Sequence, residues 1–388
     1  MSRGPASRIR AGLALVCAGL TGGCGTQAAT VAVSRPPAMT ASLSTSLTTT
    51  QGTWAIAVMG GSAASHNNFW QLFVRRANTG RWSLATPEGV ADNGGLVAAG
   101  GNGSLVVGFR PSQELAYSPL ATSTDAGLNW TPGLLDAVLA DTPGAIAVGP
   151  SGRTLALLQD GTIEAAPTAD DAAAGRWVPV ATLTALAASA PGRSCGLTGM
   201  TAVSFGPDQN PIAAGSCARP GAAGVFTDAG GTWRSAGLTL PGNGPGMGTV
   251  RVLGLTAIPG GNAALLAVGN SLLAAWWDGT RWTVSAPVTA DGVRALGFGP
   301  GGSVWLLLDS ERAETIAGAT GTWRALPPVP AGTTVLAPPG TGTLARGTGG
   351  SYDALAVSGS RLTVWRLAQG AWAKVQEVTV PVQYGSSG

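Results

Sequence analysis

Residues 278–282 read Asp-Gly-Thr-Arg-Trp, and a tight turn leading into a tryptophan in this way occurs seven times along the chain. The tryptophans of these turns are Trp82, Trp130, Trp177, Trp233, Trp282, Trp323 and Trp372. The steps between them are 48, 47, 56, 49, 41 and 49 residues. A repeat of this length, made of short apolar runs and glycine turns, is typical of a propeller blade and not of a helical solenoid.

The unit that ends at Trp282 shows the pattern most clearly. Three apolar runs, Leu253–Ile258, Ala263–Val268 and Leu272–Trp277, are separated by glycine turns, and Trp282 begins a fourth strand. Nearly continuous apolar runs are typical of strands buried on both faces. The sequence therefore predicts an all-β, seven-bladed β-propeller of four-stranded antiparallel blades over residues 52–388, and we expect no helix in it.

The two ends of the repeat region are irregular. The first unit has no convincing inner strand before Trp54, whereas the last unit continues past Trp372 with an apolar run at 375–380 and a further segment at 382–384. We expect the C-terminal segment to add a strand to the first blade and so close the ring, because closure removes open sheet edges.

Residues 1–23 have the features of a signal peptide: Arg3, Arg8 and Arg10, followed by an apolar run at 11–20 that is too short to span a bilayer. Residues 20–24, Leu-Thr-Gly-Gly-Cys, resemble a bacterial lipoprotein box, which implies that Cys24 is lipidated; plain secretion is the alternative. Residues 24–51 are rich in Ser, Thr and Pro and are expected to form a flexible tether.

Removal of the signal peptide changes the charge balance. The whole chain has 22 basic and 19 acidic residues, and the signal carries three of the basic ones, so 19 remain against 19. A neutral mature chain does not support nucleic-acid binding. Only 11% of the residues are charged.

The remaining cysteines form one candidate pair. Cys17 leaves with the signal and Cys24 is expected to carry lipid, so Cys195 and Cys217 are left. Strand alternation places both on one face, and an oxidising compartment favours a disulfide that fixes an extended loop. We therefore expect an extracytoplasmic protein that is anchored to the cell membrane only through lipid, or alternatively secreted.

One of the turns carries a complete known motif. Residues 123–130 read Ser-Thr-Asp-Ala-Gly-Leu-Asn-Trp and match the Asp-box, or bacterial neuraminidase repeat; residues 228–233 match it except that Phe226 takes the serine place. The resemblance to Asp-box propellers implies that these turns are structural and lie opposite the active face. Besides the seven tryptophans, the structural residues are Ser123, Asp125, Gly127, Asp228, Gly230 and Asp278.

The loops at the other end of the blades are the expected ligand face. By strand counting, its candidate residues are His66, Asn67, Arg110, Glu114, Asp160, Arg219, Asp309, Glu311, Arg312 and Glu314. The chain has a single histidine and no nucleophile-elbow motif, so the sequence offers no catalytic triad. We expect no metal site and no cofactor, since the cysteines are widely spaced and no glycine-rich run opens a helix.

The Asp-box also invites comparison with sialidases, which need three arginines, a Tyr–Glu pair and an aspartate. The nearest match to their arginine motif, residues 109–111, lacks an intervening residue, and the chain has only three tyrosines. The chain also resembles, loosely, the propeller assembly factors of photosynthetic membranes. We therefore expect a non-enzymatic, monomeric propeller that binds an envelope protein or an extracellular glycan; the alternatives are a sialidase-like or other glycoside hydrolase and a glycan-binding module.

Overall fold

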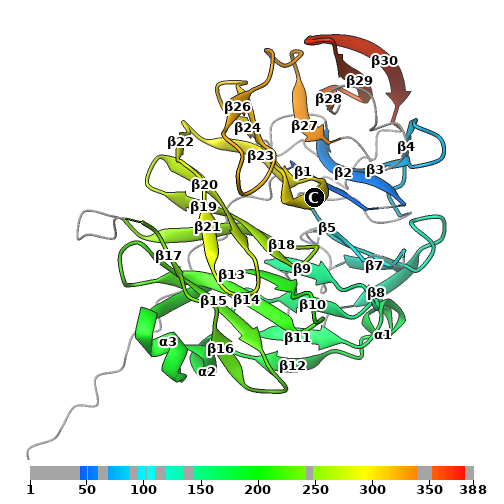
Figure 1. The fold of residues 1–388 in the computed structure, drawn as a ribbon. Coiled ribbons are helices and arrows are strands. Elements are labelled where there is room, and N and C mark those ends of the chain that lie inside the picture. The colour runs from blue at the N-terminus through cyan, green and yellow to red at the C-terminus, as the bar shows by residue number, and fades with distance from the viewer. Residues whose placement is uncertain are drawn as a thin grey trace, which may run out of the picture. The chain divides into compact units, whose positions relative to one another are not determined.

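The computed structural model describes residues 44–49, 51–59, 69–87, 95–100, 103–109, 119–134, 144–241, 248–338 and 352–380. Within these ranges the chain is all-β: antiparallel sets of four consecutive strands follow one another, with only short helical segments between them. Figure 1 shows these sets in chain order, from β1 in blue to β30 in red. We call each set a blade and name its strands A to D in chain order.

The first blades consist of β1 Ser44–Thr48, β2 Gly52–Met59, β3 Phe69–Arg76 and β4 Trp82–Leu84, then β5 Gly95–Ala99, β6 Leu105–Phe109, β7 Pro119–Ser123 and β8 Thr131–Leu134. The third blade consists of β9 Ala145–Val148, β10 Thr154–Leu157, β11 Ile163–Ala166 and β12 Val178–Ala181. The fourth consists of β13 Leu197–Phe205, β14 Pro211–Cys217, β15 Ala222–Asp228 and β16 Trp233–Ser235. The next blade consists of β18 Val250–Ile258, β19 Gly261–Val268, β20 Ser271–Trp277 and β21 Trp282–Val284. It is followed by the blade of β23 Val293–Phe298, β24 Val304–Leu308, β25 Ala313–Ile316 and β26 Arg324–Ala325. The last blade consists of β27 Thr333–Ala337, β28 Asp353–Ser358, β29 Arg361–Ala368 and β30 Ala371–Thr379. Two short strands, β17 Leu238–Thr239 and β22 Val288–Thr289, pair with the C strands β15 and β20.

The B strands are largely buried on both faces, as their apolar sequences predict. In β19 the six residues from Gly261 to Leu266 are all buried, with side chains of alternate residues in two different clusters. Ala264 and Leu266 pack toward the β13–β16 blade, and Ala263 and Leu265 toward the β23–β26 blade. Each blade is thus stabilised by apolar contact with the blade on either side.

Three of the repeated tryptophans donate hydrogen bonds to the preceding blade, whereas Trp177 Nε1 donates to Ala172 O of its own unit. Trp282 Nε1 donates to Ala236 O at 3.0 Å, Trp323 Nε1 to Ala286 O at 3.0 Å, and Trp372 Nε1 to Pro327 O at 3.2 Å. In each case the acceptor follows the D strand of the preceding blade. Each of these indoles therefore lies between two blades and joins them by a hydrogen bond to a backbone carbonyl group.

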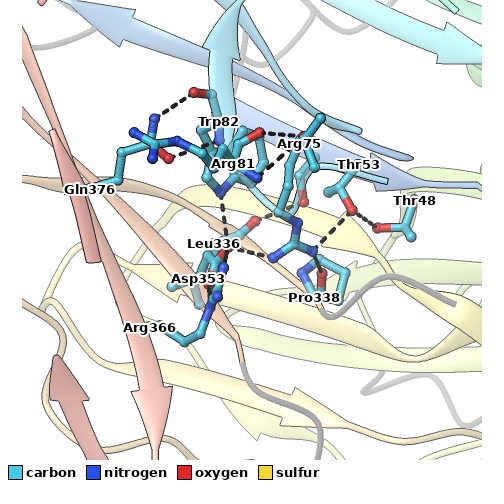
Figure 2. Close-up of polar contacts among 12 residues, drawn as sticks. Thr48, Thr53, Arg75, Arg81, Trp82, Leu336, Pro338, Asp353, Arg366 and Gln376 are labelled. Carbon is cyan, nitrogen blue, oxygen red and sulfur yellow. Dashed lines mark hydrogen bonds and ion pairs between the residues drawn. The ribbon is translucent and has the colours of Figure 1, made fainter. Parts of the chain in front are cut away.

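The first and last blades meet through a buried polar network (Figure 2). Asp353, fully buried at the start of β28, accepts hydrogen bonds from Trp82 Nε1 at 2.9 Å and from Arg366 Nε at 2.8 Å, and pairs with Arg75. Arg75 Nη2 also donates to Pro338 O at 2.8 Å. The side chain of Gln376 binds both backbone polar groups of Trp82, at 2.9 and 2.6 Å. The first tryptophan of the repeat is thus bound by the last blade.

The A strand of the first blade comes from the N-terminal side. β1 lies inside residues 24–51, where we expected a tether, and it pairs antiparallel with β2 and parallel with β23. We expected the C-terminal segment to add a strand to the first blade; the part of it up to Thr379 instead forms β30, the D strand of the last blade. The sequence concealed β1 because its polar side chains suit a tether; Ser46 is buried and donates to Leu336 O at 2.7 Å. Residues 382–384 lie outside the described residues.

The expectation of a chain without helices was also wrong. Besides a 3-10 turn at Pro300–Gly302, the described ranges contain three short α-helices: α1 Ala169–Ala173, α2 Leu183–Ala188 and α3 Ala190–Cys195. Each begins at a Ser or Thr whose hydroxyl accepts a backbone N–H, which allows a helix of five or six residues to start between strands. None of the helices described is long and apolar enough to cross a membrane.

The predicted disulfide between Cys195 and Cys217 is confirmed, with the two Cα atoms 5.4 Å apart. It joins the end of α3 to the end of β14. The segment that it fixes is therefore the α2–α3 helical pair and not the extended loop that we expected.

Candidate ligand-binding face

The described ligand-face candidates lie in the connections between B and C strands. Asp160 lies between β10 and β11, Arg219 between β14 and β15, and Asp309, Glu311 and Arg312 between β24 and β25, with Glu314 inside β25. We call this end of each blade the B–C end; it also carries the connection to the next blade. His66, Asn67, Arg110 and Glu114, like the lipidation candidate Cys24, lie outside the described residues.

The densest group of charges belongs to the β23–β26 blade, and we call it the charged cluster. It comprises Asp291, Arg294, Asp309, Glu311, Arg312 and Glu314. Arg294 Nη2 donates to Asp309 O at 3.2 Å, and Arg294 lies 3.9 Å from the Glu311 carboxylate. Glu311 has a φ of +60°, so the turn projects its side chain in a conformation that non-glycine residues seldom adopt.

The second arginine of the charged cluster is held in a different way. Arg312 Nε lies 3.2 Å from the Glu314 carboxylate, and its Nη2 donates to Thr289 O at 2.5 Å. The Glu314 side chain is buried whereas that of Arg312 is 46% exposed. Two surface guanidinium groups are thus fixed by carboxylates and carbonyl groups, which leaves other N–H groups available to a ligand.

The other described candidates are not part of the charged cluster. The Asp160 carboxylate accepts hydrogen bonds from Thr162 N at 2.8 Å and Thr162 Oγ1 at 2.9 Å, which stabilise its own turn. The backbone N–H of Arg219 donates to Cys195 O at 3.1 Å, so this residue lies beside the disulfide and the α2–α3 pair. Asp160, Arg219 and the charged cluster belong to three different blades.

Sequence reasoning missed two members of the charged cluster. Asp291 accepts a hydrogen bond from Ser310 Oγ at 3.3 Å, and Arg294 holds the turn at 309–311. Asp291 lies in the connection that leads into β23 and Arg294 at the start of β23, at the same end as the B–C turns. Counting these connections together with the B–C turns would have found them.

The repeat turns lie at the opposite end, where the A strand turns into B and the C strand into D. In the turn at 123–130, Asp125 accepts hydrogen bonds from Leu128 N at 3.0 Å and Asn129 N at 2.9 Å, and Ser123 Oγ accepts from Gly127 N at 2.9 Å. Partial burial raises the pKa of Asp125, but the hydrogen bonds from Asn129, Ser123 and Leu128 outweigh it and lower the pKa to about 2. These contacts stabilise the turn itself.

Two equivalent aspartates vary this arrangement. Asp278 accepts hydrogen bonds from the hydroxyl and N–H groups of Thr280 and from Arg281 N, which lower its pKa to about 2. Asp228 accepts one from Gly231 N at 2.7 Å, and Gly230 adopts a φ of +65°. Trp130, Trp177 and Trp233 are half-buried at the same end of their blades.

An axial cavity of about 430 Å³ is lined by A strands and by the turns from A to B. Residues from β1, β5, β9, β13, β18 and β23 contribute to it, among them Thr45, Phe205, Thr256 and Phe298. Because the A–B turns of several blades meet here, the A–B ends of these blades lie together. No sequence signal marked this cavity, since its residues are those of ordinary apolar strands.

The described residues contain no group of three or more His, Cys, Asp or Glu side chains placed to hold a metal ion. Three carboxylates of the charged cluster already have a partner. Glu311 pairs with an arginine, Glu314 pairs with the second arginine, and Asp291 accepts a hydrogen bond from a hydroxyl group. Its geometry suits the recognition of polar groups by hydrogen bonds.

Comparison with known proteins identifies the fold. No family model matches the chain, and no curated protein sequence matches it. Among solved structures it is similar to a proposed 6-phosphogluconolactonase from Bacteroides uniformis, with 14% identity, 85% of this chain and 97% of the other covered, and a TM-score of 0.51. A protein from Lactobacillus plantarum gives 13% identity, coverage of 85% and 97%, and a TM-score of 0.50. YCF48 from Cyanidioschyzon merolae gives 16% identity, with 89% of this chain and 97% of the other covered, and a TM-score of 0.43. At these identities the likeness shows the fold alone: the chain is a β-propeller.

Proposed function

We propose that this chain is a non-enzymatic, extracytoplasmic propeller that binds an envelope protein through its B–C end, with an extracellular glycan as the alternative ligand. The observation that carries the proposal is the charged cluster. Only 11% of the residues of the chain are charged, yet six of them gather between Asp291 and Glu314. Propellers commonly present their ligand sites on loops held by a rigid scaffold.

We also propose that the domain is a closed ring of seven blades. The eight-stranded sheet divides between β1 and β23 into two blades, and the other sheets contribute one each. The tryptophan contacts support closure. Trp282, Trp323 and Trp372 each bind the preceding blade, and Trp82 binds the last blade through Asp353 and Gln376. In this proposal the seven repeat turns are Asp-boxes adapted to a structural role.

The electrostatic arrangement favours recognition over hydrolysis. A glycoside hydrolase needs two carboxylates that face the scissile bond from opposite sides. In the charged cluster, Glu311 and Glu314 instead face Arg294 and Arg312. Paired guanidinium groups that keep free N–H donors bind carboxylate or hydroxyl groups of a partner.

The proposed location follows from the disulfide and from the N-terminal sequence. A disulfide in a small set of cysteines fits an oxidising compartment. We propose that Cys24 carries lipid and anchors a monomeric domain to the membrane. Replacing Cys24 with Ser should move the protein from the membrane fraction to the medium, and a variant that stays in the membrane fraction would contradict the anchor.

The binding proposal is tested by cross-linking on intact cells, with affinity capture of the tethered domain and mass spectrometry. The double variant Arg294→Ala/Arg312→Ala should lose a captured envelope protein. The control Arg281→Ala removes a guanidinium at the opposite end, where its one ion pair within the described ranges is with Asp278 at 3.6 Å, and should keep the captured protein. Capture that is unchanged in the double variant contradicts the proposal. If no protein is captured, a glycan array with a hydrolysis readout decides between a glycan-binding module and an enzyme.

A further inference from the structure

The axial cavity is lined by strand edges and not by strand faces. Side chains alternate between the two faces of a strand, so a cavity beside a face is lined by every second residue. Here the lining residues are consecutive, as in the runs 45–49, 146–148 and 255–259. In β9 and β18 the backbone N–H and C=O groups of one edge therefore face the cavity, whereas both edges of β1 are already paired, with β2 and with β23.

Several of these edges have no partner strand. β5, β9, β13 and β18 each lie at the end of their sheet, so one side of their backbone makes no ladder within the described strands. The other two A strands at the cavity, β1 and β23, pair with each other in parallel, with Thr45 opposite Leu296. An A-strand edge at this position thus already accepts a second strand in the folded protein.

The lining of the cavity is neutral. Among the described residues around it, none has an ionisable side chain, and its polar side chains are the hydroxyl groups of Thr45, Ser46, Thr48, Thr49, Ser204 and Thr256. A charged ligand would lose its hydration here without gaining an opposite charge. The run 45–49 spans about 13 Å at the usual rise of a strand, so the cavity is long enough for an extended chain of several residues.

We propose that the axial cavity binds a short, extended, uncharged peptide segment of a partner protein, which pairs with the open edge of β18. This strand contributes the longest run among the open edges, 255–259, and Ala257 within it is exposed. Addition of a strand to an open edge gives affinity through main-chain hydrogen bonds. The site is at the opposite end of the A strands from the charged cluster and does not depend on it.

The test uses the purified mature chain and a fluorescent library of acetylated, amidated hexapeptides built from Gly, Ala, Ser, Thr, Val and Leu. We expect peptides that bind in the micromolar range, and at least a tenfold weaker affinity when a central residue is replaced with Lys or Glu. Ala257→Trp and Ala99→Trp, which fill the cavity from two different strands, should each weaken binding at least tenfold. Ala371→Trp, an exposed alanine at the start of β30, is the matched control and should bind as the wild type does.

Hydrogen exchange locates the bound peptide. Amides of residues 255–258 should exchange more slowly with peptide present, whereas those of β30 should not change. The proposal is overturned if no library peptide binds, or if binding survives both cavity-filling variants while their melting curves match that of the wild type. It is also overturned if a neutral oligosaccharide is bound and lost in both variants while no peptide is. None of these results bears on the charged cluster.

Discussion

Replacement of Asp353 with Asn should open the contact between the first and last blades. The carboxylate is fully buried, and the side chain of Arg75, its partner across the blades, is only 10% exposed. The variant keeps the shape of the residue but leaves Arg75 without its counter-ion. Loss of one partner of a buried ion pair costs about 3–5 kcal/mol. Because the Arg366 side chain is 35% exposed and can regain water, we expect the lower end, about 3 kcal/mol.

Thermal and urea unfolding measure this effect. For a domain of this size about 3 kcal/mol corresponds to a fall in Tm of roughly 4 °C, because the unfolding entropy is about 2.1 cal/mol/K per residue. Asp208→Asn is the matched control, because Asp208 is exposed and binds only within its own turn; its stability should change by less than about 0.5 kcal/mol. A cycle with Arg75→Gln should show non-additivity of about 0.5–3 kcal/mol. If Asp353→Asn unfolds within about 0.5 kcal/mol of the wild type, the network does not hold the blades together.

Three further predictions concern stability. The double variant Cys195→Ser/Cys217→Ser should lose about 3 kcal/mol of unfolding free energy, since the bridge closes a loop with a separation of 22 residues; equal melting curves with and without a reductant would contradict this. Asp125→Asn should be less stable than the wild type at neutral pH. The pKa of Asp125, lowered to about 2 in the folded state, stabilises the fold above the ordinary pKa near 4, and this effect is lost as the pH falls toward 2. A difference in stability between variant and wild type that does not narrow between about pH 4 and pH 2 would refute the assigned hydrogen bonds. Gly297→Ala should cost about 1–3 kcal/mol of unfolding free energy, since its Cβ would lie 2.6 Å from Ser46 O and from the Trp305 ring. The control Gly248→Ala, with no atom nearer than 4.0 Å, should be nearly neutral. Equal losses of stability in the two variants would show that β1 does not pack closely on β23.

The sequence predicted the blades because their strands repeat one physical pattern. Runs such as Ala263–Val268 are apolar on both faces, and glycine turns and a tryptophan mark the boundaries of each unit. The disulfide followed from counting the cysteines. Counting strands predicted that Asp160, Arg219 and Asp309 lie at the B–C end of their blades.

What the sequence concealed depends on distant partners. β1 is polar and short, and it becomes a strand because β2 and β23 satisfy its backbone and Leu336 O accepts from Ser46. Asp353 and Gln376 have no sequence signal that connects them with Trp82, which is 271 and 294 residues away. The axial cavity exists only because A strands from different blades meet, so no local pattern could reveal it.

The most direct test of the proposed binding face is the affinity of the purified domain for the captured envelope protein, measured at several salt concentrations. We expect Arg294→Ala/Arg312→Ala to weaken binding at least tenfold and to reduce its dependence on salt, while Arg281→Ala leaves both unchanged. An affinity and a salt dependence that are the same in the wild type and the double variant would show that the charged cluster is not the binding site.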